Sequence, residues 1–151
     1  MTWARLMGSR QVSRTVIVAT APEKIFALLA DPARHPLIDG SGTVRAAQPG
    51  GPDRLTLGAK FGMDMKLGAS YQIVNTVVEF EENRLIAWRH FNGHRWRWRL
   101  EPVDGGRTEV TETFDWSTAR FPLAISLSPF PRKNAQGIEK TLARLTELFP
   151  A

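Results

Sequence analysis

Cysteine is absent from the 151 residues of this chain. The absence excludes disulfide bonds, iron–sulfur clusters and zinc sites built on thiolates. At this length a domain buries about two thirds of the surface that its unfolded chain exposes, so the fold needs no covalent or metal staple. We therefore expect one domain over residues 1–151 that is stabilised by an apolar core, in a protein compatible with a reducing compartment.

Long apolar runs are also absent. No segment approaches the roughly 18 consecutive apolar residues of a membrane-spanning helix. The mixed sequence of residues 1–10 lacks the apolar stretch of a signal peptide. We expect a cytoplasmic protein without a transmembrane segment, in which residues 1–10 form a flexible N-terminal extension.

Recognisable catalytic and nucleotide-binding signatures are missing as well. The sequence contains no Ser-His-Asp signature, no P-loop and no dinucleotide-binding fingerprint. His90 and His94 lie four residues apart, but no evident third ligand completes the set that a catalytic zinc requires, and an exposed pair at a turn is the favoured interpretation. We therefore predict no metal and no other cofactor.

Negative charge is outweighed by positive charge. The formal net charge is +5 and the isoelectric point is about 10.2. Such a balance makes nucleic acid and anionic membranes candidate partners. The excess is arginine, so its position along the chain decides what the charge means.

The first forty residues predict one strand and two short helices. Residues 11–18 are rich in β-branched side chains and indicate the strand. Thr20, Pro22 and Glu23 match a capping box with proline in the first helical turn. Asp31, followed by a proline, repeats the signal for a second short helix that ends before Gly40.

The centre of the chain alternates apolar and polar residues with period two, which indicates strands joined by short turns. We expect these strands from about residue 43 onward and then near residues 61–66, 71–80, 85–90, 94–101 and 108–116. The C-terminal segment returns to helical spacing, with one apolar face formed by Ala135, Ile138, Leu142, Leu145 and Phe149. The proline-rich residues 117–131 predict an irregular or partly helical flap.

These elements combine most simply as an α+β helix-grip fold. A curved antiparallel sheet of about six to seven strands buries its concave face by packing round one long helix near residues 132–149. A curved sheet that grips a straight helix leaves a gap, and such a gap is a ligand pocket. We expect residues 35–42 and the flap at 118–130 to frame its entrance.

The same order of elements resembles the START-like, Bet v 1-like superfamily (SRPBCC), in particular its bacterial polyketide cyclase/dehydrase and lipid-transport branch. The matching segments are residues 17–26, Asp31 with its proline, residues 98–112 and the leucine-rich C-terminal helix. The resemblance covers about residues 11–149 and implies one START-like ligand-binding domain. It implies a pocket rather than a reaction, because the family holds lipid carriers, cyclases and dehydratases without a universal catalytic motif.

The last hairpin predicts which side chains face that pocket. A three-residue loop at 104–106 places Trp98 opposite Glu112 and Trp96 opposite Phe114 on the inner face. Arg95, Arg97 and Arg99 then point outward, substantially exposed, with Asp115 opposite Arg95. Tryptophans on the other face cannot stack bases beside these arginines, so nucleic-acid binding is disfavoured.

Glu112 is the candidate functional residue on this face. Its carboxyl group lies among Trp96, Trp98 and Phe114 and must find a donor or stay protonated. It could be a polar anchor for a ligand or a general acid/base. The alternative is a structural carboxylate that is paired or lies at the wet rim.

The strand at 85–90 is ambiguous. A two-residue turn at 82–83 places Trp88 and His90 inside, whereas a two-residue turn at 92–93 would place Arg89 and Phe91 inside. A three-residue loop at 91–93 removes the conflict, and on that basis we predict Trp88 and His90 inside.

His35 is the second catalytic candidate. It lies four residues before Asp39 and could share a helix face with it as a dyad. The favoured interpretation is that Asp31 caps the helix, Asp39 forms a turn and His35 lies in solvent.

We therefore predict binding or carriage of a small hydrophobic molecule, such as a lipid, a polyketide or an isoprenoid-like compound. The predicted ligand-binding residues are Met63, Met65, Tyr71, Trp88, His90, Trp96, Trp98, Glu112 and Phe114. A cyclase/dehydratase-type enzyme with Glu112 or His35 moving protons is the first alternative, and an interaction module using the basic surface is the second. The sequence leaves open whether the chain forms a homodimer.

Overall fold

The structure, a computed structural model, describes residues 9–151, and the expectation for the preceding residues lies outside the described part. The strands are β1 (Gln11–Val18), β2 (Val44–Ala47), β3 (Lys60–Leu67), β4 (Ala69–Glu81), β5 (Leu85–Arg89), β6 (Arg95–Val103) and β7 (Arg107–Asp115). The helices are α2 (Pro22–Leu29), the 3-10 turn η1 (Pro32–Arg34), α3 (His35–Ile38), α4 (Pro122–Ser126) and α5 (Phe130–Leu148). Within residues 9–151, no helix combines the length and the apolar character needed to cross a bilayer.

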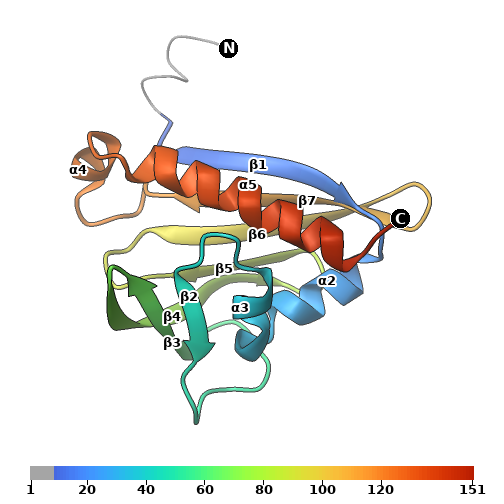
Figure 1. Ribbon diagram of the computed structural model, residues 1–151, viewed down its shortest axis with the longest axis horizontal. Coiled ribbons are helices and arrows are strands. Elements are labelled where there is room, and N and C mark those ends of the chain that lie inside the picture. The colour runs from blue at the N-terminus through green and yellow to red at the C-terminus, as the bar shows by residue number, and fades with distance from the viewer. Residues whose placement is uncertain (1–8) are drawn as a thin grey trace.

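The strands form one antiparallel sheet in the order β1-β7-β6-β5-β4-β3-β2, which curves round α5 (Figure 1). The helix packs against β1 and β7 through the buried stripe Ala135, Ile138, Thr141, Leu142 and Leu145. This stripe sits at the spacing of one helix face, so burying it joins the apolar faces of both layers. The predicted helix-grip fold is confirmed.

The register of the last hairpin is also as predicted. Trp98 lies opposite Glu112, Trp96 opposite Phe114 and Arg95 opposite Asp115. The loop at 104–106 has positive φ at both of its glycines, a conformation that other residues adopt only with strain.

The side chains of β5 face the predicted sides of the sheet, but the turn that leads into the strand differs from the predicted one. The β4–β5 turn contains three residues, because Glu81 pairs with Leu85, and not the two that were expected. A β-bulge between Val77 and Glu79 adds a compensating residue to β4. The two irregularities cancel, so Trp88 lies opposite Trp96 on the inner face.

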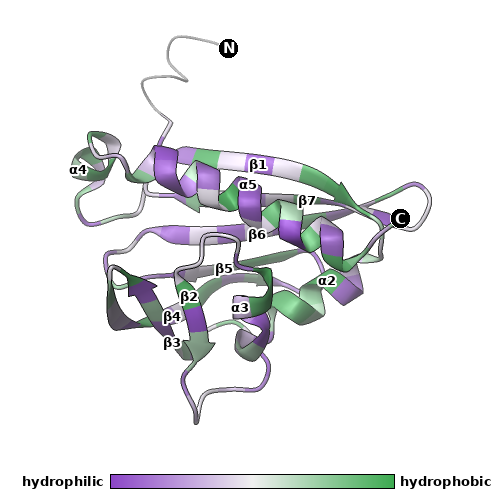
Figure 2. Ribbon diagram, viewed as in Figure 1, coloured by the Kyte–Doolittle hydropathy of each residue, from purple (hydrophilic) through white to green (hydrophobic). Residues whose placement is uncertain are grey.

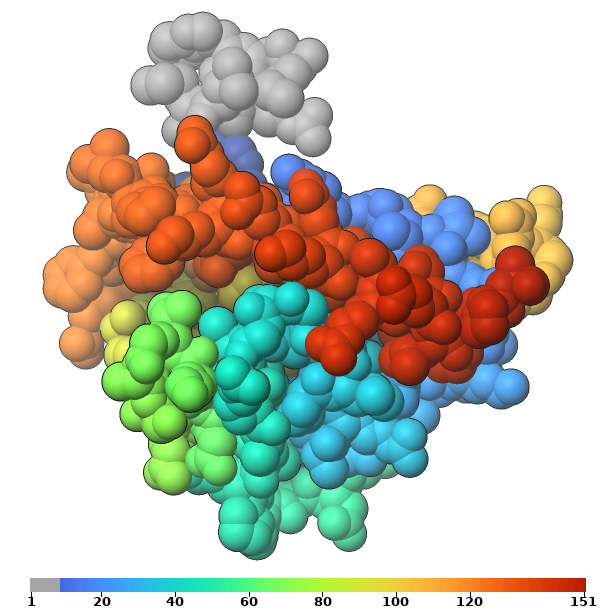
Figure 3. Space-filling view, viewed as in Figure 1, coloured from blue at the N-terminus to red at the C-terminus, as the bar shows by residue number. Residues whose placement is uncertain are grey.

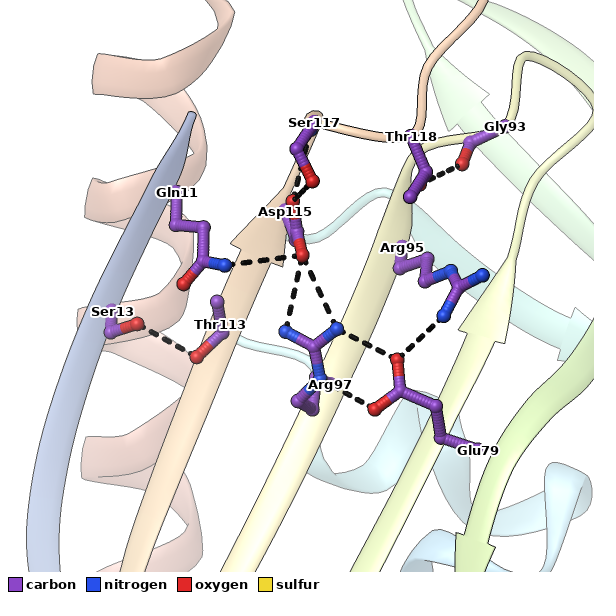
Figure 4. Close-up of polar contacts among 10 residues, drawn as sticks. All are labelled: Gln11, Ser13, Glu79, Gly93, Arg95, Arg97, Thr113, Asp115, Ser117 and Thr118. Carbon is purple, nitrogen blue, oxygen red and sulfur yellow. Dashed lines mark hydrogen bonds and ion pairs between the residues drawn. The ribbon is translucent and has the colours of Figure 1, made fainter. Parts of the chain in front are cut away.

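The outer face of the sheet carries a network of ion pairs that ties β4, β6 and β7 together (Figure 4). Arg97 donates to Glu79 at 2.7 Å and 2.8 Å and to Asp115 at 3.2 Å and 3.3 Å, while Arg95 donates to Glu79 at 2.9 Å. These hydrogen bonds lower the pKa of Glu79 to about 2. The prediction of substantial exposure is correct for Arg99 but wrong for Arg95 and Arg97, because the network covers their guanidinium groups.

Of the two helix caps predicted for the first helices, one is wrong and one is confirmed. Helix α2 starts at Pro22, so its N-cap is Ala21 and not Thr20. Thr20 is buried instead, and its carbonyl accepts a hydrogen bond from the hydroxyl of Thr108. Asp31 caps η1 as expected, accepting from the amide of Ala33 at 3.1 Å.

Candidate functional site

An aromatic cluster covers the inner face of β5, β6 and β7. Phe114 lies at its centre, with ring centroids 5.0 Å from Trp96 and 5.4 Å from Trp116. Trp98 is almost fully buried and Trp96 is half-buried. Alternation along the antiparallel strands β6 and β7 brings these rings together, because every second residue of each strand points into the concavity.

Glu112 lies on the same face beside Phe114 and opposite Trp98. Its carboxyl group is buried, and its Oε1 has no hydrogen-bond partner among the described residues. Burial raises the pKa of Glu112 well above its usual value, and the negative charge of Asp39 adds to the shift. The shift favours the protonated acid, which can donate as well as accept a hydrogen bond.

A second unpaired polar atom occurs on β4, which is separated from β7 by β6 and β5 in the sheet. Asn75 lies on the same buried face of β4 as Ile73 and Val77, and its Oδ1 has no partner among residues 9–151. Asn75 is not among the site residues predicted from the sequence. The signal was available, since a polar residue at an inward position of a buried strand is the same anomaly that identified Glu112.

His90 and His94 lie at the β5–β6 turn, and they are partly buried rather than forming the exposed pair that was predicted. The amide of His90 donates to the carbonyl of His94 at 3.1 Å, and their rings lie 4.6 Å apart. Burial lowers the pKa of His90 to about 3, helped by His94, and also lowers that of His94. The reason for the burial is tertiary, because Thr118 donates to the carbonyl of Gly93 at 2.6 Å and holds the following segment over the turn.

His35 is likewise buried, where solvent exposure was predicted. Its Nε2 lies 2.8 Å from the carbonyl oxygen of Leu29, and its ring stacks on Trp88 at 4.9 Å. The dyad with Asp39 does not form, because the Asp39 carboxylate instead accepts from Ser41 and from the amide of Val44. Burial lowers the pKa of His35, so the ring is held neutral as part of the core.

The segment after α3 is anchored directly to α5. The amide of Gly40 donates to the hydroxyl of Thr141 at 2.9 Å, and Arg144 donates to the carbonyl of Asp39 at 2.6 Å. A Cβ at position 40 would lie 2.4 Å from the backbone carbon of Lys140, so only glycine fits there without a shift. This contact closes the concavity along one side of the helix.

The remaining predicted wall residues lie on the β3–β4 side. Met63 and Met65 are buried, whereas Tyr71, which pairs with Met65 near the start of β4, is 42% exposed. Met65 and Tyr71 belong to a hollow of about 680 Å³ that also involves Arg45. A second hollow of about 410 Å³ lies at the β5–β6 turn and is lined in part by Arg89, Phe91 and Arg120.

The space-filling view shows where the interior approaches the surface (Figure 3). A recess opens between the orange α4 region, the turquoise residues after α3 and the green β3–β4 hairpin, with yellow strand residues at its floor. Trp116 holds the α4 side of this recess by donating from Nε1 to the hydroxyl of Ser126 at 2.8 Å. The entrance formed by residues 35–42 and 118–130, and the cavity behind it, stay a prediction.

Comparison with known proteins gives the same architecture. The sequence profile of the family described as polyketide cyclase/dehydrase and lipid transport matches residues 9–149. Uncharacterized protein Rv0088 of Mycobacterium tuberculosis is 42% identical over 150 residues, which cover 94% of this chain and 65% of that protein. This chain therefore spans about 65% of the length of that relative.

Solved structures share the fold at low sequence identity. Protein CV1439 of Chromobacterium violaceum superposes with a TM-score of 0.70 at 14% identity, covering 93% of this chain and 99% of that one. The Aha1 dimer of Colwellia psychrerythraea gives a TM-score of 0.66 at 15% identity, covering 92% and 95%. At such identities the likeness concerns the fold alone.

Proposed function

Because this chain belongs to the polyketide cyclase/dehydrase and lipid transport family, we propose that it binds a small, largely apolar molecule between α5 and the inner face of the sheet. The observation that carries the proposal is the carboxyl group of Glu112, buried among aromatic rings with Oε1 unpartnered in the described chain. A buried polar atom without a partner costs about 1–3 kcal/mol. A ligand that supplies the missing hydrogen bond recovers this energy.

The chemistry of the wall defines the class of ligand. Its aromatic and methionine side chains suit an apolar body. The histidines at the turn are neutral at physiological pH because burial lowers the pKa of both. Protonated Glu112 then donates to a carbonyl oxygen, which points to a ligand with one carbonyl or hydroxyl group on a hydrocarbon skeleton. Lipids, polyketides and isoprenoid-like compounds meet this description.

The neutral, carbonyl-bearing dye Nile red tests the proposal. We expect the wild-type protein to bind it with increased fluorescence, and Glu112→Ala to bind about tenfold more weakly because the donor is lost. Glu112→Gln keeps an N–H donor and should stay within about threefold of wild type. Glu109→Gln is the matched control, since Glu109 lies on the same strand but is exposed.

Two results would contradict the proposal. One is that the wild-type protein, shown to be folded by circular dichroism, takes up no dye. The other is that Glu112→Ala and Glu109→Gln bind the dye equally well, because the buried carboxyl group would then play no part in recognition.

A second candidate function rests on the same residue. A carboxylic acid whose pKa is raised can protonate a carbonyl or a departing hydroxyl group, as a cyclase or dehydratase of polyketide-like substrates requires. His35 is the weaker candidate, because its Nε2 is engaged by the carbonyl of Leu29. Loss of turnover with retained binding in Glu112→Gln, measured on a β-hydroxyketone by the absorbance of the enone formed, would favour the enzyme.

A further inference from the structure

Five large apolar side chains are exposed at one end of the molecule. Their exposed fractions run from 50% for Phe130 to 82% for Leu127. We call this set the α4 face, and it consists of Phe91, Phe121, Leu123, Leu127 and Phe130. Figure 1 places α4 at this end, and Figure 2 shows its apolar residues in green. Isolated exposed apolar residues are ordinary, but a group of this size at one end indicates a contact surface.

Hydrogen bonds make the α4 face contiguous. The amide of Arg120 donates to the carbonyl of Asn92 at 2.7 Å, so the turn that carries Phe91 is joined to the segment that leads into Phe121. Leu123 on α4 and Leu127, the C-cap residue of α4, are about one helical turn apart and lie on the same side, with the amide of Leu127 donating to the carbonyl of Leu123 at 3.0 Å.

The charge around this face has one sign. Residues 116–138 contain no aspartate or glutamate, but include Arg120, Arg132 and Lys133, which are all exposed. Arg89 and Arg120 line the 410 Å³ hollow beside Phe91. Within residues 9–151, no carboxylate lies in ion-pair contact with either arginine. The hollow thus offers two guanidinium groups to an anion of phosphate size.

From these features we infer that the α4 face docks onto the surface of an anionic lipid bilayer. Apolar side chains would enter the boundary between headgroups and acyl chains, while the flanking cations meet the negative headgroups. A nucleic acid would use the cations but gives no role to exposed Leu123 and Leu127. The recess of Figure 3 opens next to α4, so docking would bring its mouth to the lipid. Direct exchange of a ligand with the membrane is an extension that rests on the proposed function, whereas docking itself does not.

Vesicle co-sedimentation tests the inference. We expect the wild-type protein to sediment with vesicles of phosphatidylcholine and phosphatidylglycerol, and far less with phosphatidylcholine alone. Leu123→Glu combined with Leu127→Glu should weaken the binding by about tenfold or more. Arg120→Gln combined with Lys133→Gln should also weaken it and flatten its salt dependence.

Two variants at other places serve as controls. Leu57→Glu changes an apolar residue of similar exposure in a different loop, and Lys24→Gln removes an exposed cation from α2. Both should sediment like wild type. Thermal melts show that each variant is folded, which is expected because the altered side chains are exposed.

Several outcomes would overturn the inference. These are absence of wild-type binding, binding that ignores lipid charge, and equal loss in the control variants. A concentration-dependent dimer that the Leu123/Leu127 variant disrupts, without vesicle binding by wild type, would make the face a contact between copies. Two measurements separate this proposal from the interior site. In vesicle-free solution, the α4-face variants should still take up Nile red. In the vesicle assay, Glu112→Ala should still bind.

Discussion

At the residue scale, two glutamates on the same sheet show how position decides chemistry. Glu79 lies on the outer face between two arginines, whose hydrogen bonds lower its pKa to about 2. Glu112 lies on the inner face, where burial raises its pKa well above the usual value. The shift of Glu79 favours its charged form, and the shift of Glu112 favours its neutral acid form. The side chains are identical, so the difference comes entirely from the face of the strand that carries each one.

The raised pKa of Glu112 predicts a pH-dependent gain in stability on substitution. Because the pKa of Glu112 is higher in the folded state, its titration favours folding most at pH values below its unfolded pKa, near 4.5. This contribution to stability is lost as pH rises toward the folded pKa. Glu112→Gln should therefore increase the free energy of unfolding at pH 7 by about 1–3 kcal/mol and change it little near pH 4. Urea denaturation at both pH values measures this. Exposed Glu109→Gln should change stability by less than about 0.5 kcal/mol at either pH, and a destabilised Glu112→Gln at pH 7 would contradict the assignment.

At Gly40 we expect substitution to change stability through steric overlap rather than through charge. A methyl group there would meet the backbone of Lys140 at 2.4 Å, so Gly40→Ala forces the loop and α5 apart. We expect a loss of about 1–3 kcal/mol in the free energy of unfolding. Gly51→Ala is the control, because its nearest neighbour would be 3.8 Å away. Equal stability of the two variants would show that the 39–42 loop is not held as described.

At the scale of elements, the outer network connects strands that are distant in sequence. Glu79 on β4 accepts from Arg95 and Arg97 on β6, and Arg97 also reaches Asp115 on β7. The network crosses β5, which lies between β4 and β6 in the sheet. At this point β5 has the small outward-facing side chain of Ala87, which is fully buried beneath the network. Its small size leaves room for the long side chains of β4 and β6 to meet above β5.

Removing the charge of Glu79 should loosen this connection. We expect Glu79→Gln to lose about 2 kcal/mol of stability at pH 7, since two arginines are left with a weaker acceptor. The lowered pKa means that the wild-type advantage is present above the unfolded pKa, near 4.5, and disappears as pH falls toward about 2. Urea denaturation of the wild type and of Glu79→Gln at pH values from 7 to 2.5 measures this difference in stability. Glu101→Gln, at an exposed position of β6, should track wild type throughout, and parallel curves for Glu79→Gln and wild type would refute the ion-pair role.

At the scale of the whole molecule, all three histidines lie at the inner side of the sheet with lowered pKa values. His35 stacks on Trp88 in the core, His94 contacts Phe114 edge to face, and His90 lies against His94. The folded state therefore excludes protons that the unfolded chain binds below pH 6.5.

Mild acid should accordingly destabilise the protein. A depressed folded pKa means that the stabilising contribution is complete above the unfolded pKa of 6.5 and is lost as pH falls, for His90 down to about 3. The free energy of unfolding should decrease by up to about 1.4 kcal/mol per pH unit for each histidine that titrates in this way. Replacing His90 and His94 together by Gln should reduce the slope between pH 6.5 and 5. An unchanged slope would mean that solvent reaches both rings.

Much of the fold follows from local sequence patterns. Alternation along residues 94–116 and the glycine loop between them predict the register, because shifting it by one residue would expose every inward side chain. The apolar stripe of α5 predicts the helix and its buried face in the same way. Glu112 stood out for the same reason, as a carboxyl group at an inward position of a regular strand.

Other features depend on contacts that no local pattern contains. The buried state of His35 requires Trp88 from a strand more than fifty residues later. The partial burial of His90 and His94 requires the segment after β7. The bulge in β4 and the long β4–β5 turn cancel each other, so neither changes the alternation that a sequence displays. Sequence periodicity thus determined which residues share a face. Only the tertiary structure decided which groups are desolvated, because desolvation depends on what the rest of the chain places over each face.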